Sequence, residues 1–161
     1  DAVQDDGIEV EVVSAGGTGS HDVAGAYPGI TEIEAGSYVF MDARYNPIQG
    51  AKFKPALALL STVVSRPSKN RAVLDAGIKA ITKEFGTPPI KDVEGAEIVH
   101  LSEEHSKVEL SGSSRDLKAG DKVQIIPSHG CTTISLHDKY YGIRNGVVEV
   151  IWDIAARGAF V

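Results

Sequence analysis

Two short segments of this chain carry the residue types that could take part in chemistry, and the first is rich in glycine. It reads Gly16-Gly17-Thr18-Gly19-Ser20 and follows a strand-like run over residues 8–13. Glycines let the backbone come close to an anion, successive N–H groups can point at it, and Thr18 and Ser20 add hydroxyl donors. Phosphate can be bound in this way without a lysine. A flexible surface loop is the competing interpretation of the same residues.

The second segment is His129-Gly130-Cys131. In an extended segment, residues two apart project to the same side, so His129 and Cys131 could bind one ion. Imidazole together with thiolate favours zinc over magnesium or calcium. Two protein ligands are too few for a closed structural site, so such a site would leave positions open for water or substrate. The alternative is a buried histidine beside an inert, buried cysteine.

Other polar residues near these segments could support them. His21 and Asp22 directly follow the glycine loop and could line the same pocket. His137 with Asp138 could support the metal pair, because metal-bound imidazoles often lean on a carboxylate or a carbonyl. Solvent exposure explains this second pair equally well. Trp152 is most simply a core anchor of the final strand.

The elements that must position these residues are mostly short strands. Alternation followed by an apolar pair predicts a strand over residues 8–13, and residues 30–42 are expected to form two short strands around Ala35-Gly36. Asn145-Gly146 tolerates the positive φ angles of a type I′ turn and predicts a hairpin. Residues 77–85 fit a short helix or an irregular turn. Further strands are expected over residues 57–65, 71–76, 98–101, 107–110, 122–126, 140–144 and 147–154.

This pattern predicts a mainly β fold. Many short strands at close spacing indicate a small antiparallel β-barrel or sandwich domain. A strand that ends in a glycine-rich loop is instead typical of an α/β unit, so a boundary is expected near residue 30. The length of 161 residues fits one ordinary domain, or one small domain with a piece of another.

Composition excludes several function classes. The chain is 42% hydrophobic and 24% charged, as in soluble globular proteins, and its net charge of −6 argues against a nucleic-acid surface. No apolar run approaches the roughly 18 residues of a membrane span. Cys131 is the single cysteine, which excludes an internal disulfide and fits a reducing compartment, so we expect a cytoplasmic protein. The chain opens with Asp1, which fits a removed initiator, a trimmed tag or a missing or separate N-terminal portion.

Several blocks of sequence, taken in order, resemble the C-terminal part of one enzyme family. That family contains the D-threonine aldolases and the metal-dependent D-serine dehydratases. The similarity covers nearly the whole chain, and the agreement of separate blocks is more specific than either motif alone. The blocks are residues 13–20, 31–42 and 126–133, followed by Trp152 and residues 156–158.

The resemblance implies an enzyme that uses pyridoxal 5′-phosphate (PLP) and a divalent metal. In this family a TIM-like α/β barrel carries the PLP lysine and a β-rich C-terminal domain carries the metal ligands. Residues 1–30 would then be the end of the barrel, with its last strand and phosphate loop, and residues 31–161 the metal-binding β domain. The PLP lysine would precede this sequence, since neither Lys79 nor Lys83 lies in a matching context.

The same resemblance assigns the candidate site residues and partners. The PLP phosphate would be held by residues of the glycine loop, and the metal by the second segment. A small D-amino acid is the implied substrate, the missing barrel region or a companion chain the implied partner, and a homodimer the implied assembly. The phosphate residues are Gly17, Thr18, Gly19 and Ser20, and the metal ligands are His129 and Cys131.

The reaction itself stays open between two members of the family. Dehydratase-like members resemble His-x-Cys at the metal, whereas aldolases typically show His-x-Asp, and this chain has Cys131. Its flanking residues 126–129 and 144–152 resemble the aldolases instead. We therefore expect aldol cleavage to glycine and an aldehyde, with dehydration of D-serine to pyruvate and ammonia, or a non-catalytic metal-binding β domain, as alternatives. The thiolate favours zinc over manganese or magnesium.

Overall fold

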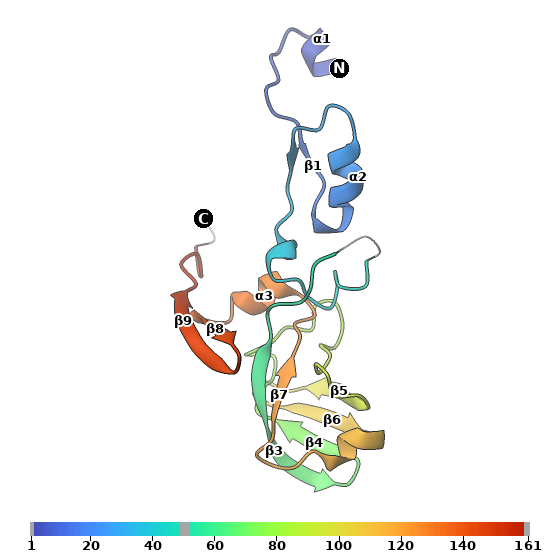
Figure 1. Ribbon diagram of the computed structural model, residues 1–161, viewed down its shortest axis with the longest axis vertical. Coiled ribbons are helices and arrows are strands. Elements are labelled where there is room, and N and C mark those ends of the chain that lie inside the picture. The colour runs from blue at the N-terminus through green and yellow to red at the C-terminus, as the bar shows by residue number, and fades with distance from the viewer. Residues whose placement is uncertain (1, 49–51, 160–161) are drawn as a thin grey trace.

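The computed structural model describes residues 2–48 and 52–159, and a small N-terminal unit lies at one end of it (Figure 1). After the short helix α1 (Ala2–Asp5), strand β1 (Ser14–Ala15) runs parallel to β2 (Glu32–Ile33). Between them lie the 3-10 turn η1 (Thr18–Ser20) and helix α2 (His21–Ala26). The glycine loop therefore joins a strand to a helix, as in an α/β unit. The boundary near residue 30 stays a prediction.

Two of the predicted strands in this region are wrong. Residues 8–13 are irregular, because in the described part of the chain only the two-residue strand β2 offers β1 a neighbour. A strand without a neighbour has no partner for its backbone N–H and C=O groups. The second strand expected within residues 30–42 is instead the 3-10 turn η2 (Ser37–Val39), whose bonds are local, such as Met41 N–H to the carbonyl of Ser37.

A curled, antiparallel five-stranded sheet forms the other end of the molecule (Figure 1). This half-barrel confirms the mainly β fold class, and the neighbouring strands lie in the order β5-β6-β4-β3-β7. The strand predicted over residues 57–65 begins later and continues through Arg66-Pro67 to Ser68. The strands are β3 (Leu59–Ser68), β4 (Arg71–Leu74), β5 (Ala96–Leu101), β6 (Ser106–Leu110) and β7 (Lys122–Ile125).

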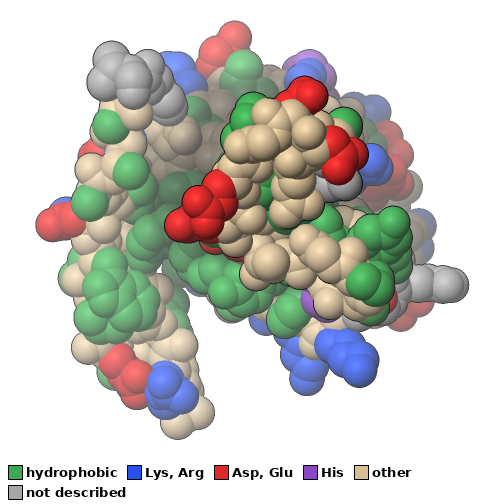
Figure 2. Space-filling model, turned by 90° about the horizontal axis from the view of Figure 1, so that it is seen from above, with side chains coloured by type: hydrophobic (Ala, Val, Ile, Leu, Met, Phe, Trp, Pro, Cys, Tyr) green, Lys and Arg blue, Asp and Glu red, His purple; other side chains and the backbone are tan. Residues whose placement is uncertain are grey.

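The C-terminal hairpin follows helix α3 (Gly130–Ile134) and pairs β8 (Lys139–Arg144) with β9 (Val147–Asp153). Asn145 and Gly146 have φ angles of 50° and 77°, so the predicted hairpin turn is confirmed. The hairpin stands apart from the sheet and shows hydrophobic side chains on its surface (Figure 2, left). Trp152 is 55% exposed, so its prediction as a core anchor is wrong.

A groove of about 450 Å³ separates this hairpin from the start of β3 and from α3. Leu59, Ile134, Tyr140 and Ile143 are among the side chains that line it. The hairpin therefore adds little to the buried core. Among the described residues, no helix is long and apolar enough to cross a membrane.

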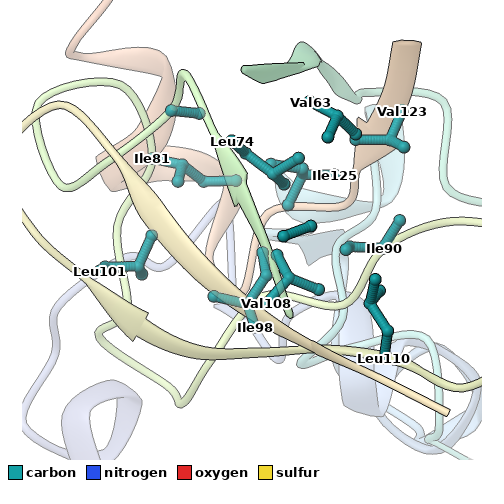
Figure 3. Close-up of a cluster of buried hydrophobic side chains, with 12 residues drawn as sticks. Val63, Leu74, Ile81, Ile90, Ile98, Leu101, Val108, Leu110, Val123 and Ile125 are labelled. Atoms are coloured by element: carbon teal, nitrogen blue, oxygen red, sulfur yellow. The ribbon is translucent and has the colours of Figure 1, made fainter. Parts of the chain in front are cut away.

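The core lies inside the curl of the five-stranded sheet (Figure 3). Alternate residues of β6 and β7 are buried, as expected for strands with one face toward a core. Cross-strand register places Val63 opposite Leu74, and Ile98 opposite Val108. The buried cluster comprises Val63, Ala72, Leu74, Ala76, Ile81, Ile90, Ile98, Leu101, Val108, Leu110, Val123 and Ile125.

Two adjacent valines of β3 test this core. Val63 is 0% exposed and Val64 is 46% exposed. Val63→Ala removes two buried carbons and leaves a cavity, so we expect it to lower the free energy of unfolding by about 2 kcal/mol. Val64→Ala on the opposite face is the matched control and should cost under about 0.5 kcal/mol. Urea denaturation of both variants measures the difference, and equal losses would contradict this placement of the core.

Candidate active site

The glycine loop turns through Gly16 and leaves open space at Gly17. Gly16 has a φ of +77°, and a Cβ built there would lie 2.7 Å from the Cβ of Ala24 in α2. No other residue type fits that position without strain. Gly17 has an ordinary extended φ of −154°, and a Cβ there would meet nothing within 4 Å. The tight turn therefore depends on Gly16, whereas Gly17 borders the space that an anion would occupy.

The hydroxyl groups of the loop serve mainly to shape it. Gly17 N–H donates to Oγ of Ser20 at 3.2 Å, and Ser20 N–H donates to the Gly17 carbonyl at 3.1 Å. Thr18 is 4% exposed, and its Oγ1 accepts a bond from the N–H of Tyr38 at 3.0 Å. In the part of the chain that the structure describes, the N–H groups of Thr18 and Gly19 have no acceptor outside the turn. These two donors and the open space at Gly17 fit a phosphate group.

The two polar residues after the loop have different surroundings. His21 donates through Nδ1–H to the carbonyl of Thr18 at 2.9 Å, and its ring packs against Phe53. It therefore lies beside the loop, as expected. Asp22 is exposed and bonds the N–H of Val23 in its own helix at 2.9 Å, so the expected lining of the pocket by Asp22 is not seen.

His129 lies at the entry to α3, where the chain changes from strand to helix. Its φ and ψ of −141° and 121° are extended, but Gly130 and Cys131 already belong to the helix. The prediction of an extended segment is therefore wrong beyond His129, because the chain turns into α3 there. Cys131 is exposed and His129 is half-buried, so the alternative of an inert buried pair does not hold.

Glu84 orients the imidazole of His129. Its Oε2 lies 2.7 Å from Nδ1 of His129, and the ring of His129 packs against Phe85 with centroids 4.7 Å apart. The bond to His129, and secondarily one to Thr132, lowers the pKa of the Glu84 carboxyl below its usual value. Nε2 of His129 is left without a partner among the described residues. A carboxylate on one imidazole nitrogen and a metal on the other is a recurrent arrangement.

The expected support from His137 and Asp138 is wrong. Nε2 of His137 lies 2.7 Å from the carbonyl of Ala80, and Asp138 forms an ion pair with Arg157. The sequence offered no signal for Glu84, which lies 45 positions before His129. The chain between β4 and β5 turns so that Glu84 lies beside His129.

The described residues contain no group of three or more His, Cys, Asp or Glu side chains placed to hold a metal. The pair His129 and Cys131 could therefore supply only part of a coordination sphere. Its donor set, one imidazole nitrogen and one accessible thiol, suits zinc with positions left open. The residues present thus fit an open metal site and do not fit a closed structural one.

A buried carboxylate lies between the two candidate segments. Asp42 is 1% exposed, and its Oδ2 accepts a bond from the N–H of Gly130 at 2.8 Å. Its Oδ1 accepts bonds from the N–H groups of Arg44 and Tyr45, each at 3.0 Å. Asp42 had no predicted role beyond membership of a block of similarity, because nothing in its spacing points to Gly130.

Comparison with known proteins places this fold and these segments in one family. A family model described as "Putative serine dehydratase domain" matches residues 56–143. The chain is 38% identical over 97% of its length to a D-threonine aldolase of an Arthrobacter species and 37% identical over 98% to a 3-hydroxy-D-aspartate aldolase of Paracoccus denitrificans. A D-serine dehydratase of Dictyostelium discoideum is 29% identical over 86% of the chain. The chain spans about two fifths of the length of these relatives, 41–42%.

Solved structures agree with these relatives. The D-threonine aldolase of Filomicrobium marinum superposes with a TM-score of 0.92 over 99% of this chain and 45% of its own, at 36% identity. A D-threo-3-hydroxyaspartate dehydratase variant with a histidine replaced by alanine superposes with a TM-score of 0.74 over 87% of this chain and 42% of its own, at 26% identity. A metal-free variant of a dehydratase of that name, with a cysteine two positions after that histidine replaced by alanine, superposes with a TM-score of 0.78 at 24% identity and shows the shared fold.

Proposed function

The chain belongs to the serine dehydratase domain family of lyases, and from that membership we propose that it is the C-terminal portion of a PLP- and divalent-metal-dependent lyase acting on D-β-hydroxy amino acids. One observation carries the proposal: a D-threonine aldolase matches 99% of the chain at 36% identity, a span that includes both the glycine loop and the His129 turn. D-threonine aldolase-like cleavage to glycine and an aldehyde is the proposed reaction.

Dehydration of a D-β-hydroxy amino acid is the second candidate, and a specific observation favours it. His129 and Cys131 have the same spacing as the histidine and cysteine that were replaced in the dehydratase variants. The aldolases are nevertheless the more similar relatives, at 37–38% identity against 29% for the D-serine dehydratase. Overall similarity and the His-x-Cys pair therefore favour different reactions, and the products must decide between them.

PLP supplies an electron sink at the amino acid Cα when it is bound. The proposed role of this chain is to hold the phosphate group of PLP. The N–H groups of Thr18 and Gly19 would donate to its oxygens, the absence of a side chain at Gly17 would permit close approach, and Ser20 keeps the loop closed through its bond with Gly17. The PLP lysine is assigned to a barrel region, or a companion chain, beyond these residues.

A divalent metal, when bound, would supply Lewis-acid chemistry at the β-hydroxyl of the substrate. Nε2 of His129 and the thiolate of Cys131 would hold it, with zinc favoured over manganese and magnesium. Glu84 would accept a hydrogen bond from Nδ1–H of His129, which would orient the ring so that Nε2 faces the metal. The remaining coordination positions of the metal would be filled by water or substrate. The chain would act in a homodimer or in a complex with the companion region.

Product analysis tests the proposal and separates the two reactions. The intact protein, supplied with PLP and zinc, is incubated with D-threonine, 3-hydroxy-D-aspartate and D-serine, and the matching L-amino acids are the controls. Glycine with an aldehyde supports the aldolase, whereas a keto acid with ammonia supports the dehydratase. Turnover of neither class would reject the enzyme in favour of a non-catalytic metal-binding domain.

The 161-residue chain alone is expected to be inactive toward all three D-amino acids. The reason is that none of its lysines is assigned to PLP. Purified chain should show no Schiff-base absorbance at about 410–420 nm after PLP is added, whereas a protein that includes the barrel region should show it. Absorbance at that wavelength together with turnover by the isolated chain, with no partner protein in the preparation, would contradict the assignment.

A further inference from the structure

The carboxylate of Asp42 bonds the second candidate segment directly, at Gly130, and its neighbour Tyr45 packs against Gly19 of the glycine loop. We propose that Asp42 is a positioning residue that fixes the His129–Cys131 turn relative to the glycine loop. This inference rests on the proposed function, because it concerns the placement of the proposed metal ligands. Asp42 would contact neither the substrate nor the metal.

The bonds of Asp42 are made to backbone, and they use both of its oxygens. Oδ1 accepts from Arg44 and Tyr45, and Oδ2 accepts from Gly130, the residue between the two proposed metal ligands. All three partners are N–H groups, and among the described residues no cation neutralises this carboxylate. Its observed contacts therefore align backbone segments and do not form an ion pair. Bonds from N–H groups to a carboxylate are stronger than those to a neutral acceptor.

Further contacts tie the same segment to the glycine loop. A Cβ built on Gly19 would lie 3.6 Å from Cε1 of Tyr45, so the ring of Tyr45 packs closely over Gly19. Tyr38 N–H, four residues before Asp42, donates to Oγ1 of the buried Thr18. A continuous set of packed groups thus runs from the phosphate loop through Tyr45 and Asp42 to Gly130.

The turn beside Asp42 is itself held in an uncommon conformation. Met41 has a φ of 51°, which side chains other than glycine rarely adopt, yet its side chain is 1% exposed. Ala43 N–H donates to the carbonyl of Pro127 at 2.9 Å, a second bond between this turn and the segment before His129. Backbone strain of this kind persists where surrounding contacts determine the geometry closely.

Asp42→Asn tests the role with the smallest possible change. The amide oxygen of asparagine can keep the bonds to Arg44 and Tyr45, but its NH₂ group would then face the N–H of Gly130, so two donors would oppose each other. We expect zinc affinity, measured by competition with a chromogenic chelator, to fall by about 10- to 100-fold, the usual effect of losing an orienting partner. PLP affinity should stay within about threefold, because the loop donors are unchanged.

A spectroscopic signature accompanies this loss. Cobalt(II) bound through Cys131 should give a thiolate-to-metal absorption band, and the band should weaken or shift in Asp42→Asn because the thiol is no longer held in place. Asp121→Asn is the matched control. Its Oδ2 also accepts a bond from a backbone N–H, that of Lys118 at 2.7 Å, but it lies outside both candidate segments. Its zinc affinity and cobalt spectrum should match those of the wild type.

A double variant addresses the possibility that loss of the carboxylate only weakens the fold. Asp42→Ala leaves the buried N–H of Gly130 without an acceptor, and adding Gly130→Pro removes that N–H. Gly130 is the first residue of α3, where proline is tolerated, and the extended backbone of His129 suits a following proline. We expect the double variant to regain at least part of the zinc affinity lost in Asp42→Ala.

The outcomes separate this inference from the proposed function. Wild-type zinc affinity and an unchanged cobalt band in Asp42→Asn would overturn the positioning role while leaving the metal site intact, and no recovery in the double variant would overturn its route through Gly130. Parallel losses of zinc affinity, PLP affinity and thermal stability would show a merely structural carboxylate. Failure of the wild-type protein to bind zinc would remove the metal site, and the inference would fall with it.

Discussion

Replacement of His129 or Cys131 by alanine is expected to lower metal-dependent activity at least about a thousandfold, because Lewis-acid stabilisation contributes several kcal/mol to such reactions. Nε2 of His129 is free to bind a metal, since Glu84 occupies Nδ1, and the thiol of Cys131 is exposed. The glycine loop is a separate segment, so the absorbance of bound PLP should be largely unchanged. Steady-state assays across zinc concentrations, with PLP spectra of each variant, measure both effects.

His100→Ala provides a matched control for the histidine. His100 is exposed on β5, outside both candidate segments, so its replacement should leave the activity and the zinc dependence unchanged. A folded, fully active and metal-indifferent Cys131→Ala protein would remove the metal assignment. It would also remove most of the argument for a β-hydroxy substrate.

Cys131→Asp separates the metal preference from the reaction. Because Cys131 is exposed in the first turn of α3, a carboxylate there is not buried, and negative charge near a helix N-terminus is tolerated. The variant should therefore fold normally. A hard oxygen ligand suits manganese better than a thiolate does. The activity lost in Cys131→Ala should therefore be recovered in Cys131→Asp when manganese is supplied, and the preference for zinc should fall.

The glycine loop gives a second large effect, and two neighbouring glycines make it specific. Gly17→Val should lower PLP affinity by about tenfold or more, since a branched side chain would enter the open space where the phosphate approaches. It should change the free energy of unfolding little, because the extended φ of Gly17 suits any residue. The effect thus comes from blocked approach, and not from a backbone angle that only glycine adopts.

Gly16→Val should mainly lower the stability of the fold. Its φ of +77° and the 2.7 Å contact with Ala24 predict a loss of about 1–3 kcal/mol of stability. Thermal unfolding and PLP titration of the two variants distinguish the cases. A Gly17→Val protein with unchanged PLP affinity would remove the loop from the cofactor site.

The sheet and the hairpin could be predicted from local sequence, since their signals are local. Alternating burial on β6 and the Asn145-Gly146 turn appear directly in the order of residue types. The run over residues 8–13 carries a similar alternation, yet it forms no strand, because a strand also requires a neighbour that local sequence does not reveal. Trp152 was misassigned for a related reason: a strand can be apolar and still lie outside the core.

The site could be predicted only in part. His129, Cys131 and the glycine loop stand out by residue type and by resemblance. Glu84 and Asp42 do not, because each acts across a large sequence separation: 45 positions from Glu84 to His129 and 88 from Asp42 to Gly130. Groups that orient other groups leave no spacing pattern, so they emerge only once the fold brings them together.

The exposed hairpin also bears on edge-to-edge aggregation of this chain. Its strands carry exposed Ile143, Val148 and Ile151, the composition of segments that add to another molecule's sheet edge. Two ion pairs bracket this apolar middle: Lys139 with Asp153 at the open end, and Arg144 with Glu149 near the turn. Full charges on a strand edge make edge-to-edge pairing of identical strands unfavourable, and exposed ion pairs of this kind add little to stability.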